Sequence, residues 1–204
     1  MAPHFSGFSA PPDHRAPVNY ELFRVINDLA GRWGAVDQTM RLAATVLIYP
    51  LFAAAGVAIL RALWQRRFRR IIDVGLTLTF AYGMAALLHH LSRQRRPFQT
   101  HVVHQLIPHD PGVSMPSDHA VAALTVGLAV FVFLSRRVGA ALLVVAMVIG
   151  FSRVWAGVHY PGDILAAAVI AVLATVEVWV FERRVSDLRP RAALAGAAGP
   201  RPPR

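Results

Sequence analysis

The chain has 204 residues, of which 55% are hydrophobic and only 16% are charged, with a formal net charge of +10. The hydrophobic residues stand in long blocks rather than in the amphipathic stripes of a soluble helical domain, so the composition indicates an integral membrane protein. Cysteine and lysine are absent, which excludes disulfides and thiolate metal sites and leaves arginine as the source of all 21 basic side chains.

The amino-terminal segment precedes the first apolar block and divides into two parts. Residues 1–17 are rich in proline and small residues and lack the apolar core of a secretory signal, so we expect a flexible tail. Residues 19–31 carry apolar side chains at helical spacing but are too polar to span a membrane. They predict a helix that lies in the membrane interface.

Five later blocks approach the roughly 20 apolar residues that a helix needs to cross the hydrocarbon core. They run approximately over 42–63, 71–91, 117–134, 138–158 and 163–181. The short turn at 135–137 predicts that the third and fourth blocks form an antiparallel helical hairpin. Glycines inside the blocks are expected to allow close helix packing; they are Gly75, Gly83, Gly127, Gly139 and Gly150. The expected fold is an all-α integral membrane bundle of five transmembrane helices plus the amino-terminal interfacial helix.

The distribution of arginine predicts the orientation of this bundle. Thirteen arginines fall in the 61–70 loop, in the 135–137 turn and in residues 183–204, and eight fall on the other side. The positive-inside rule places the larger set in the cytoplasm, so residues 183–204 become a disordered, basic cytoplasmic tail behind a membrane-embedded domain of residues 18–182. The opposite face of the bundle then looks to the periplasm or the cell exterior.

Polar clusters mark the junctions that helix alternation brings to this outer face. They lie within 89–98, 114–119 and 152–163. Arginine has a planar fork that suits phosphate oxygens, and histidine can act as a nucleophile or carry a proton. An aspartate four residues after a histidine can orient the ring. The three clusters together predict a phosphate-handling site at the membrane surface.

The clusters also resemble a known family. Arg96-Pro97, Pro116-Ser117-Asp118-His119, and Ser152-Arg153 with His159 and Asp163 resemble the three motifs of the type 2 phosphatidic acid phosphatase superfamily, over roughly residues 71–181. Asp118, Tyr160-Pro161 and the 19–23 segment are similar to the bacitracin-resistance type of undecaprenyl-diphosphate phosphatase. His89 stands where the first motif usually has a lysine; a cationic imidazole would supply part of that charge, or Arg93 or Arg95 could reach in.

The resemblance implies a role for each residue. His159 would attack the terminal phosphorus and form a phosphohistidine, with Asp163 orienting its ring. His119 would act as an acid and then as a base. The implied phosphate-binding residues are Arg96, Ser117, Arg153, His89 and Asp118. No metal or other cofactor is required by this scheme, and the loop residues His101, His104, His109 and Asp110 are interpreted as a substrate-facing loop rather than a metal site.

These residues lead to the hypothesis of a phosphoric anhydride or phosphomonoester hydrolase in a bacterial plasma membrane. It would convert undecaprenyl diphosphate to undecaprenyl phosphate and so recycle the lipid carrier of peptidoglycan synthesis. Alternatives in the same fold are a phosphatidate or phosphatidylglycerophosphate phosphatase, or a lipid phosphotransferase. A different class is a non-catalytic binder or transporter of anionic lipids. The expected partners are lipid phosphates and membrane lipids, not nucleic acid, and the sequence leaves the oligomeric state open.

Overall fold

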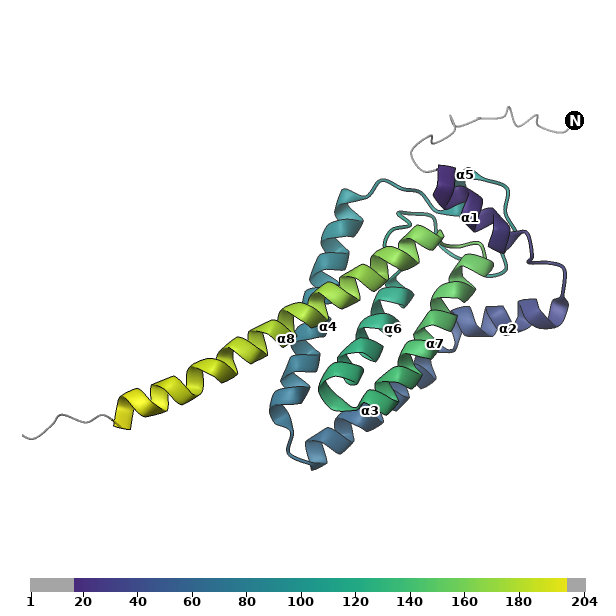
Figure 1. Ribbon diagram of the computed structural model, residues 1–204. Coiled ribbons are helices and arrows are strands. Elements are labelled where there is room, and N and C mark those ends of the chain that lie inside the picture. The colour runs from purple at the N-terminus through teal and green to yellow at the C-terminus, as the bar shows by residue number, and fades with distance from the viewer. Residues whose placement is uncertain (1–16, 198–204) are drawn as a thin grey trace, which may run out of the picture.

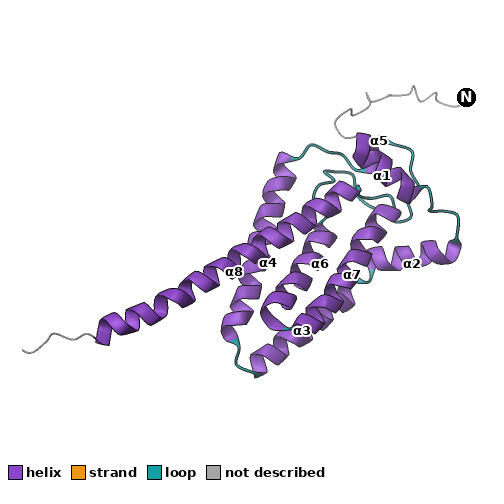
Figure 2. Cartoon of the chain, viewed as in Figure 1, coloured by secondary structure: helices purple, strands orange, loops and turns teal. Residues whose placement is uncertain are grey.

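The computed structural model describes residues 17–197, with side chains described for residues 18–186, and this part of the chain is almost entirely helical (Figures 1 and 2). The flexible tail predicted for residues 1–17 lies outside the described residues except for Pro17. In chain order the helices are α1 Pro17–Asn27, α2 Gly34–Thr45, α3 Ile48–Trp64, α4 Phe68–Leu91, α5 Pro97–Thr100, α6 Asp118–Ala129, the π-helical turn η1 Val130–Leu134, α7 Arg136–Trp155 and α8 Pro161–Ala197.

Helix α6 forms the centre of the bundle, and α3, α4, α7 and α8 pack around it (Figure 1). Every residue from Ala120 to Gly127 is buried. Alanines and branched aliphatic side chains from all five helices make one continuous core there. Because many of these side chains are small, the helices can approach one another closely.

Three helices in the described part of the chain are long and apolar enough to cross a membrane, namely α4, α7 and the Pro161–Ser186 part of α8. Helices α2 and α3 meet the same description together as one bent span, with an angle of 46° between them. The predicted third span is different, because the 12 residues of α6 and the 5 of η1 extend only about 26 Å against a hydrocarbon core of about 30 Å. In place of the five expected spans, the described residues thus contain three or four clear ones around a shorter central helix.

Two boundaries differ from the sequence prediction. The block expected at 42–63 is broken after Thr45, so α2 is a separate helix that the apolar pattern did not reveal. Residues 183–197, expected to be part of a disordered tail, continue α8 as helix, while residues 198–204 lie outside the described residues. The composition of this segment suggested disorder, but alanine and arginine are frequent there and both are strong helix formers.

The predicted hairpin between the third and fourth blocks is present as α6–η1 and α7, joined at Ser135. The Ser135 hydroxyl accepts a hydrogen bond from the Val138 N–H at 3.4 Å and so caps α7. Gly139 lies directly against η1, since a Cβ added to it would be 2.2 Å from the Phe131 Cα. Gly127 and Gly150 are also close to neighbouring side chains, whereas Gly75 and Gly83 have open space around them, so the packing role expected for those two is wrong.

Helix α1 packs across the end of the bundle where α7 ends and α8 begins (Figure 1). Its buried Phe23 contacts a cluster that includes Val154 and Tyr160. Its last residue, Asn27, donates to the Trp155 carbonyl at 2.8 Å and to the His104 carbonyl at 2.9 Å, and accepts from the His104 N–H at 2.9 Å. Helix α1 therefore holds the 101–113 loop against the end of α7.

Replacement of Gly139 by alanine is predicted to destabilise the hairpin by about 2 kcal/mol or more, because the added methyl group collides with backbone that cannot move freely. The matched control is Gly83→Ala, which has open space and should be neutral or slightly stabilising in a helix. Thermal unfolding in detergent measures both variants. Equal stability of the two would contradict the close contact between Gly139 and Phe131.

Candidate active site

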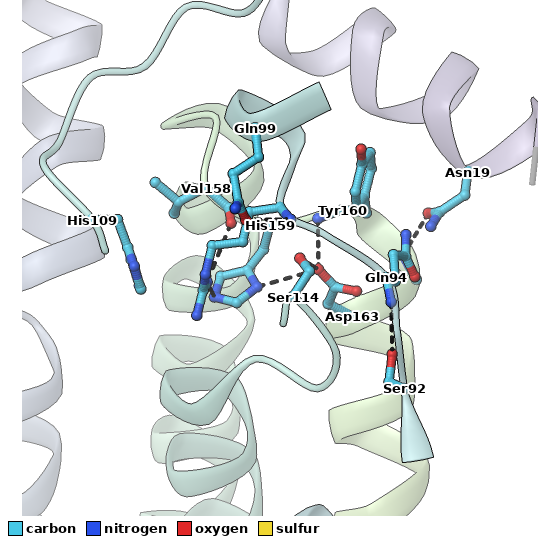
Figure 3. A network of polar contacts seen from close by, with 12 residues as sticks. Asn19, Ser92, Gln94, Gln99, His109, Ser114, Val158, His159, Tyr160 and Asp163 are labelled. Carbon is cyan, nitrogen blue, oxygen red and sulfur yellow. Dashed lines mark hydrogen bonds and ion pairs between the residues drawn. The ribbon is translucent and has the colours of Figure 1, made fainter. Parts of the chain in front are cut away.

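The three polar clusters meet at one end of the bundle, where α4 and α7 end and α6 and α8 begin (Figures 1 and 3). Arg96 immediately precedes α5, Ser117 occupies the N-cap position of α6, and His159 lies in the turn between α7 and α8. Asp163 lies in the first turn of α8, whose first residue is Pro161. Proline suits that position because its fixed φ angle matches the helix and its missing N–H is not needed there.

The ring of His159 is held between an acceptor and a donor. Its Nδ1 lies 3.2 Å from Asp163 Oδ2, and its Nε2 lies 3.0 Å from Arg96 Nη1. A guanidinium can only donate, so Nε2 accepts and the ring proton is on Nδ1, which donates to the carboxylate. This tautomer leaves a lone pair on Nε2 and makes that atom the nucleophilic one.

Burial controls the charge of His159, whose side chain is 2% exposed. Removal from water lowers its pKa to about 4; the hydrogen bond and charge of Asp163 oppose this shift, and Arg153 and Arg96 add to it. The ring is therefore neutral at physiological pH. A neutral ring is what nucleophilic attack on phosphorus requires.

A single oxygen atom of Asp163 accepts from three donors, two in the α7–α8 turn and one in the segment before α6. Besides the ring of His159, its Oδ2 accepts from the Ser114 hydroxyl at 2.5 Å and from the Tyr160 N–H at 2.9 Å (Figure 3). Three donors hold this carboxylate in place, where it can support a developing imidazolium. Ser114 was not among the sequence candidates, because only its position three residues before Ser117 could have suggested it.

Two buried arginines lie beside His159 and Asp163. Arg96 is 7% exposed and Arg153 is 3% exposed, and both are within electrostatic range of His159. Arg153 Nη1 donates to the Ala44 carbonyl at 3.0 Å, near the end of α2. Burial lowers the pKa of Arg96 from its ordinary value. Among the described residues, neither guanidinium lies within ion-pair distance of a carboxylate.

Three buried donor atoms at this site lack a partner in the described part of the chain. They are Arg96 Nε, Arg153 Nε and the Ser117 hydroxyl. An unpaired buried donor is costly, and a buried cation without a counter-charge is more so. The three donors come from three different motifs, and an anion with several oxygen atoms would satisfy all of them.

The remaining candidates differ in position. His119, in the first turn of α6, is half-buried and within electrostatic range of Arg153 and His159, so it borders the same space. Asp118 is exposed at the rim. His89 is exposed at the end of α4, where its ring makes an edge contact with His90. Among the described residues no hydrogen bond or ring contact joins His89 to the buried group, so the structure does not bring it into the site.

The three histidines of the 101–113 loop contact different parts of the protein. His101 stacks on Tyr20 with ring centroids 3.8 Å apart, and His104 lies against Gly31. His109 instead reaches the site, where its ring meets that of His159 edge-on at 5.9 Å between centroids. In the part of the chain that the structure describes, no three side chains of the metal-binding types gather into a possible ligand set.

Comparison with known proteins agrees with this geometry. Residues 70–187 match the family model of the PAP2 superfamily. The chain is 34% identical to undecaprenyl-diphosphatase BcrC of Bacillus subtilis over 85% of this chain and 87% of that protein. It is 30% identical to bacitracin transport permease protein BcrC of Bacillus licheniformis, with 87% of each protein covered. The crystal structure of Aquifex aeolicus LpxE superposes with a TM-score of 0.64 at 25% identity, over 79% of this chain and 94% of that one.

The fold and the site together define a multi-pass membrane phosphatase. The chain belongs to the PAP2 superfamily. The resemblance inferred from the three motifs is thereby confirmed.

The Ser114→Ala substitution is predicted to lower kcat by about tenfold, because it removes one charge-assisted hydrogen bond from the carboxylate that orients His159. The control is Ser135→Ala, which removes a serine hydroxyl at the opposite end of the bundle. Steady-state phosphate release measures the effect. Unchanged turnover of Ser114→Ala would show that Asp163 holds the ring without this donor.

The pH dependence of stability provides another test of the buried, neutral His159. Its pKa is about 4 in the folded protein and 6.5 ordinarily, so between these values the unfolded chain takes up a proton that the native site resists. The stability from this residue is complete above pH of about 6.5 and is lost as the pH falls toward 4. Thermal unfolding at pH of about 7.5 and about 5 should show a smaller acid-induced loss for His159→Gln than for the unsubstituted protein. Equal losses would contradict the lowered pKa.

Proposed function

We propose that the protein removes the terminal phosphate from undecaprenyl diphosphate at the outer face of a bacterial plasma membrane. One observation carries the proposal: buried, unpaired donors of Arg96, Ser117 and Arg153 lie at the same site as a histidine whose Nε2 carries the lone pair, which accepts from Arg96 until the substrate takes that donor. The substrate assignment is supported by the similarity to the Bacillus subtilis relative, which is an undecaprenyl-diphosphatase.

In the proposed reaction, His159 Nε2 attacks the terminal phosphorus in line with the bridging oxygen. Arg96 leaves the ring nitrogen and, with Arg153 and the α6 amides, holds the nonbridging oxygens as charge redistributes. Asp163 stabilises the ring, which becomes positively charged as the N–P bond forms. His119 gives a proton to the leaving oxygen and later activates the water that hydrolyses the phosphohistidine.

The proposed arrangement in the membrane follows the expected bundle. Helices α2–α3, α4, α6–η1, α7 and α8 all cross the bilayer, and α1 lies in the outer interface. The turns at 65–67 and 135–137 then face the cytoplasm with the carboxyl terminus, in agreement with the positive-inside rule. A site at the outer headgroup level would accept a diphosphate whose isoprenoid chain stays in the lipid.

Purified protein in detergent with a chelator tests the proposal. Released phosphate is measured with undecaprenyl diphosphate, phosphatidate and phosphatidylglycerophosphate, and the first should give the highest kcat/KM. His159→Ala should lower kcat by at least about a thousandfold, while His90→Ala, a substitution on the exposed end of α4, should be active. Acid-labile radioactive phosphate should label the unsubstituted protein and not His159→Ala.

Each alternative has its own outcome in this experiment. Higher kcat/KM with phosphatidate or phosphatidylglycerophosphate would replace the proposed substrate. Tight binding without phosphate release would identify a non-catalytic lipid binder. Full turnover by His159→Ala would reject the nucleophile.

A further inference from the structure

His109 is a third histidine at the site, and no motif of the family accounts for it. It lies in the loop between α5 and α6 and is half-buried. Its ring makes an edge contact with the nucleophilic ring, with an angle of 87° between the planes. It is also within electrostatic range of Arg96, Arg153 and His119. The side chain therefore borders the space in which the phosphoryl group must lie.

A backbone contact determines which nitrogen of His109 faces that space. Nδ1 lies 3.2 Å from the Asp110 carbonyl oxygen, which can only accept, so Nδ1 carries the proton of this hydrogen bond. Nε2 is then left for another partner. It accepts in the neutral ring and donates in the imidazolium, and so it can bind a phosphate oxygen once the ring is protonated.

The direction of attack places His109 on the side of the leaving group. The Nδ1 atom of His159 faces Asp163, so its Nε2 faces the opposite side, where it contacts Arg96. Figure 3 shows His109 on this side of the ring as well. In an in-line displacement the leaving oxygen departs along the same direction, away from the attacking nitrogen. A group that leaves in this direction would depart toward His109.

We propose that His109 binds the internal phosphate of the substrate, the phosphate that stays on the lipid, and so selects lipid diphosphates over lipid monophosphates. This inference rests on the proposed function and assigns the contact that distinguishes the two substrate classes at the same site. A monophosphate ester presents an alkyl oxygen at this place, with no anionic oxygens for an imidazolium to bind.

The chemical step balances without transfer of the His109 proton. The His159 Nε2–phosphorus bond forms while the bond from phosphorus to the bridging oxygen breaks, and the electron pair stays on that oxygen. His119 protonates the oxygen, which leaves as part of the lipid monophosphate. The imidazolium of His109 balances the remaining negative charge on that phosphate. Water then attacks the phosphohistidine, releases inorganic phosphate and returns the proton to His119.

The charges around His109 explain why its protonation would depend on the substrate. Burial lowers its pKa; the positive charges of Arg96 and Arg153 lower it further, and the bond to the Asp110 carbonyl opposes them. The empty site therefore holds a neutral ring. A diphosphate neutralises the arginines and adds negative charge, which favours the imidazolium when the substrate binds.

Two conservative variants separate phosphate binding from a structural role. Asparagine places an amide near the Nδ1 position and can keep the bond to the Asp110 carbonyl, whereas glutamine places its amide near Nε2. Under the proposal, His109→Asn lowers kcat/KM for undecaprenyl diphosphate by about tenfold or more, the factor of one charge-assisted hydrogen bond. His109→Gln retains more activity than His109→Asn. The matched control is His104→Gln in the same loop, which leaves kcat/KM unchanged.

Comparison of a lipid monophosphate with a lipid diphosphate tests whether His109 selects between the two substrate classes. Turnover of phosphatidate should fall much less than turnover of undecaprenyl diphosphate in both His109 variants, so the ratio of the two kcat/KM values should fall about tenfold. With the diphosphate, kcat of the unsubstituted protein should fall at high pH as bound His109 and His119 lose their protons, and His109→Gln should lack the part of this fall that belongs to His109 while it keeps the part that belongs to His119. Equal reductions with both substrates, or full activity of His109→Asn, would overturn the proposal.

Binding of a non-hydrolysable anion keeps this test independent of the natural substrate. Calorimetry with methylenediphosphonate and with orthophosphate should show that His109→Asn weakens the diphosphonate about tenfold and orthophosphate by less than about twofold. If the protein did not prefer undecaprenyl diphosphate, the proposed function would fail while this difference could still be measured. If the two anions lost affinity equally, His109 would not contact a second phosphate.

Discussion

The carboxylate of Asp163 is the point on which the site depends. One oxygen atom accepts from a ring in the α7–α8 turn, from the Tyr160 amide beside it and from a hydroxyl in the segment before α6. The hydrogen bonds are possible only if α6 and α8 begin at the same level. The carboxylate thus aligns two helices and selects the reactive nitrogen of His159 with the same set of contacts.

The cost of this arrangement is a buried surplus of positive charge. Arg96 and Arg153 lie within electrostatic range of each other, and the described residues offer no carboxylate at ion-pair distance from either. Such a pair is unfavourable in an empty site and favourable once a phosphate group is bound. Binding energy is therefore concentrated where negative charge moves during phosphoryl transfer.

The outer layer of the bundle keeps the charged residues in place. Asn27 ties the end of α1 to the 101–113 loop, and Asp37 in α2 accepts the Trp155 indole N–H at 2.9 Å. The break after α2 leaves the Ala44 carbonyl available to Arg153. Helices α1 and α2, which carry no motif residue, thus position the arginine and the loop that carries His109.

The sequence by itself determined the class of fold, most of the apolar helices and the motif residues, because blocks of hydrophobic side chains and polar junctions are local patterns. Helix alternation even predicted that Arg96, Ser117 and His159 would share one end of the bundle. The tertiary structure alone decided the break at Thr45 and the partners of Asp163. It also decided that His89 lies outside the site and that His109 borders it. These features depend on contacts between residues far apart in the chain, and a side chain gives no local sign of the neighbour that will satisfy it.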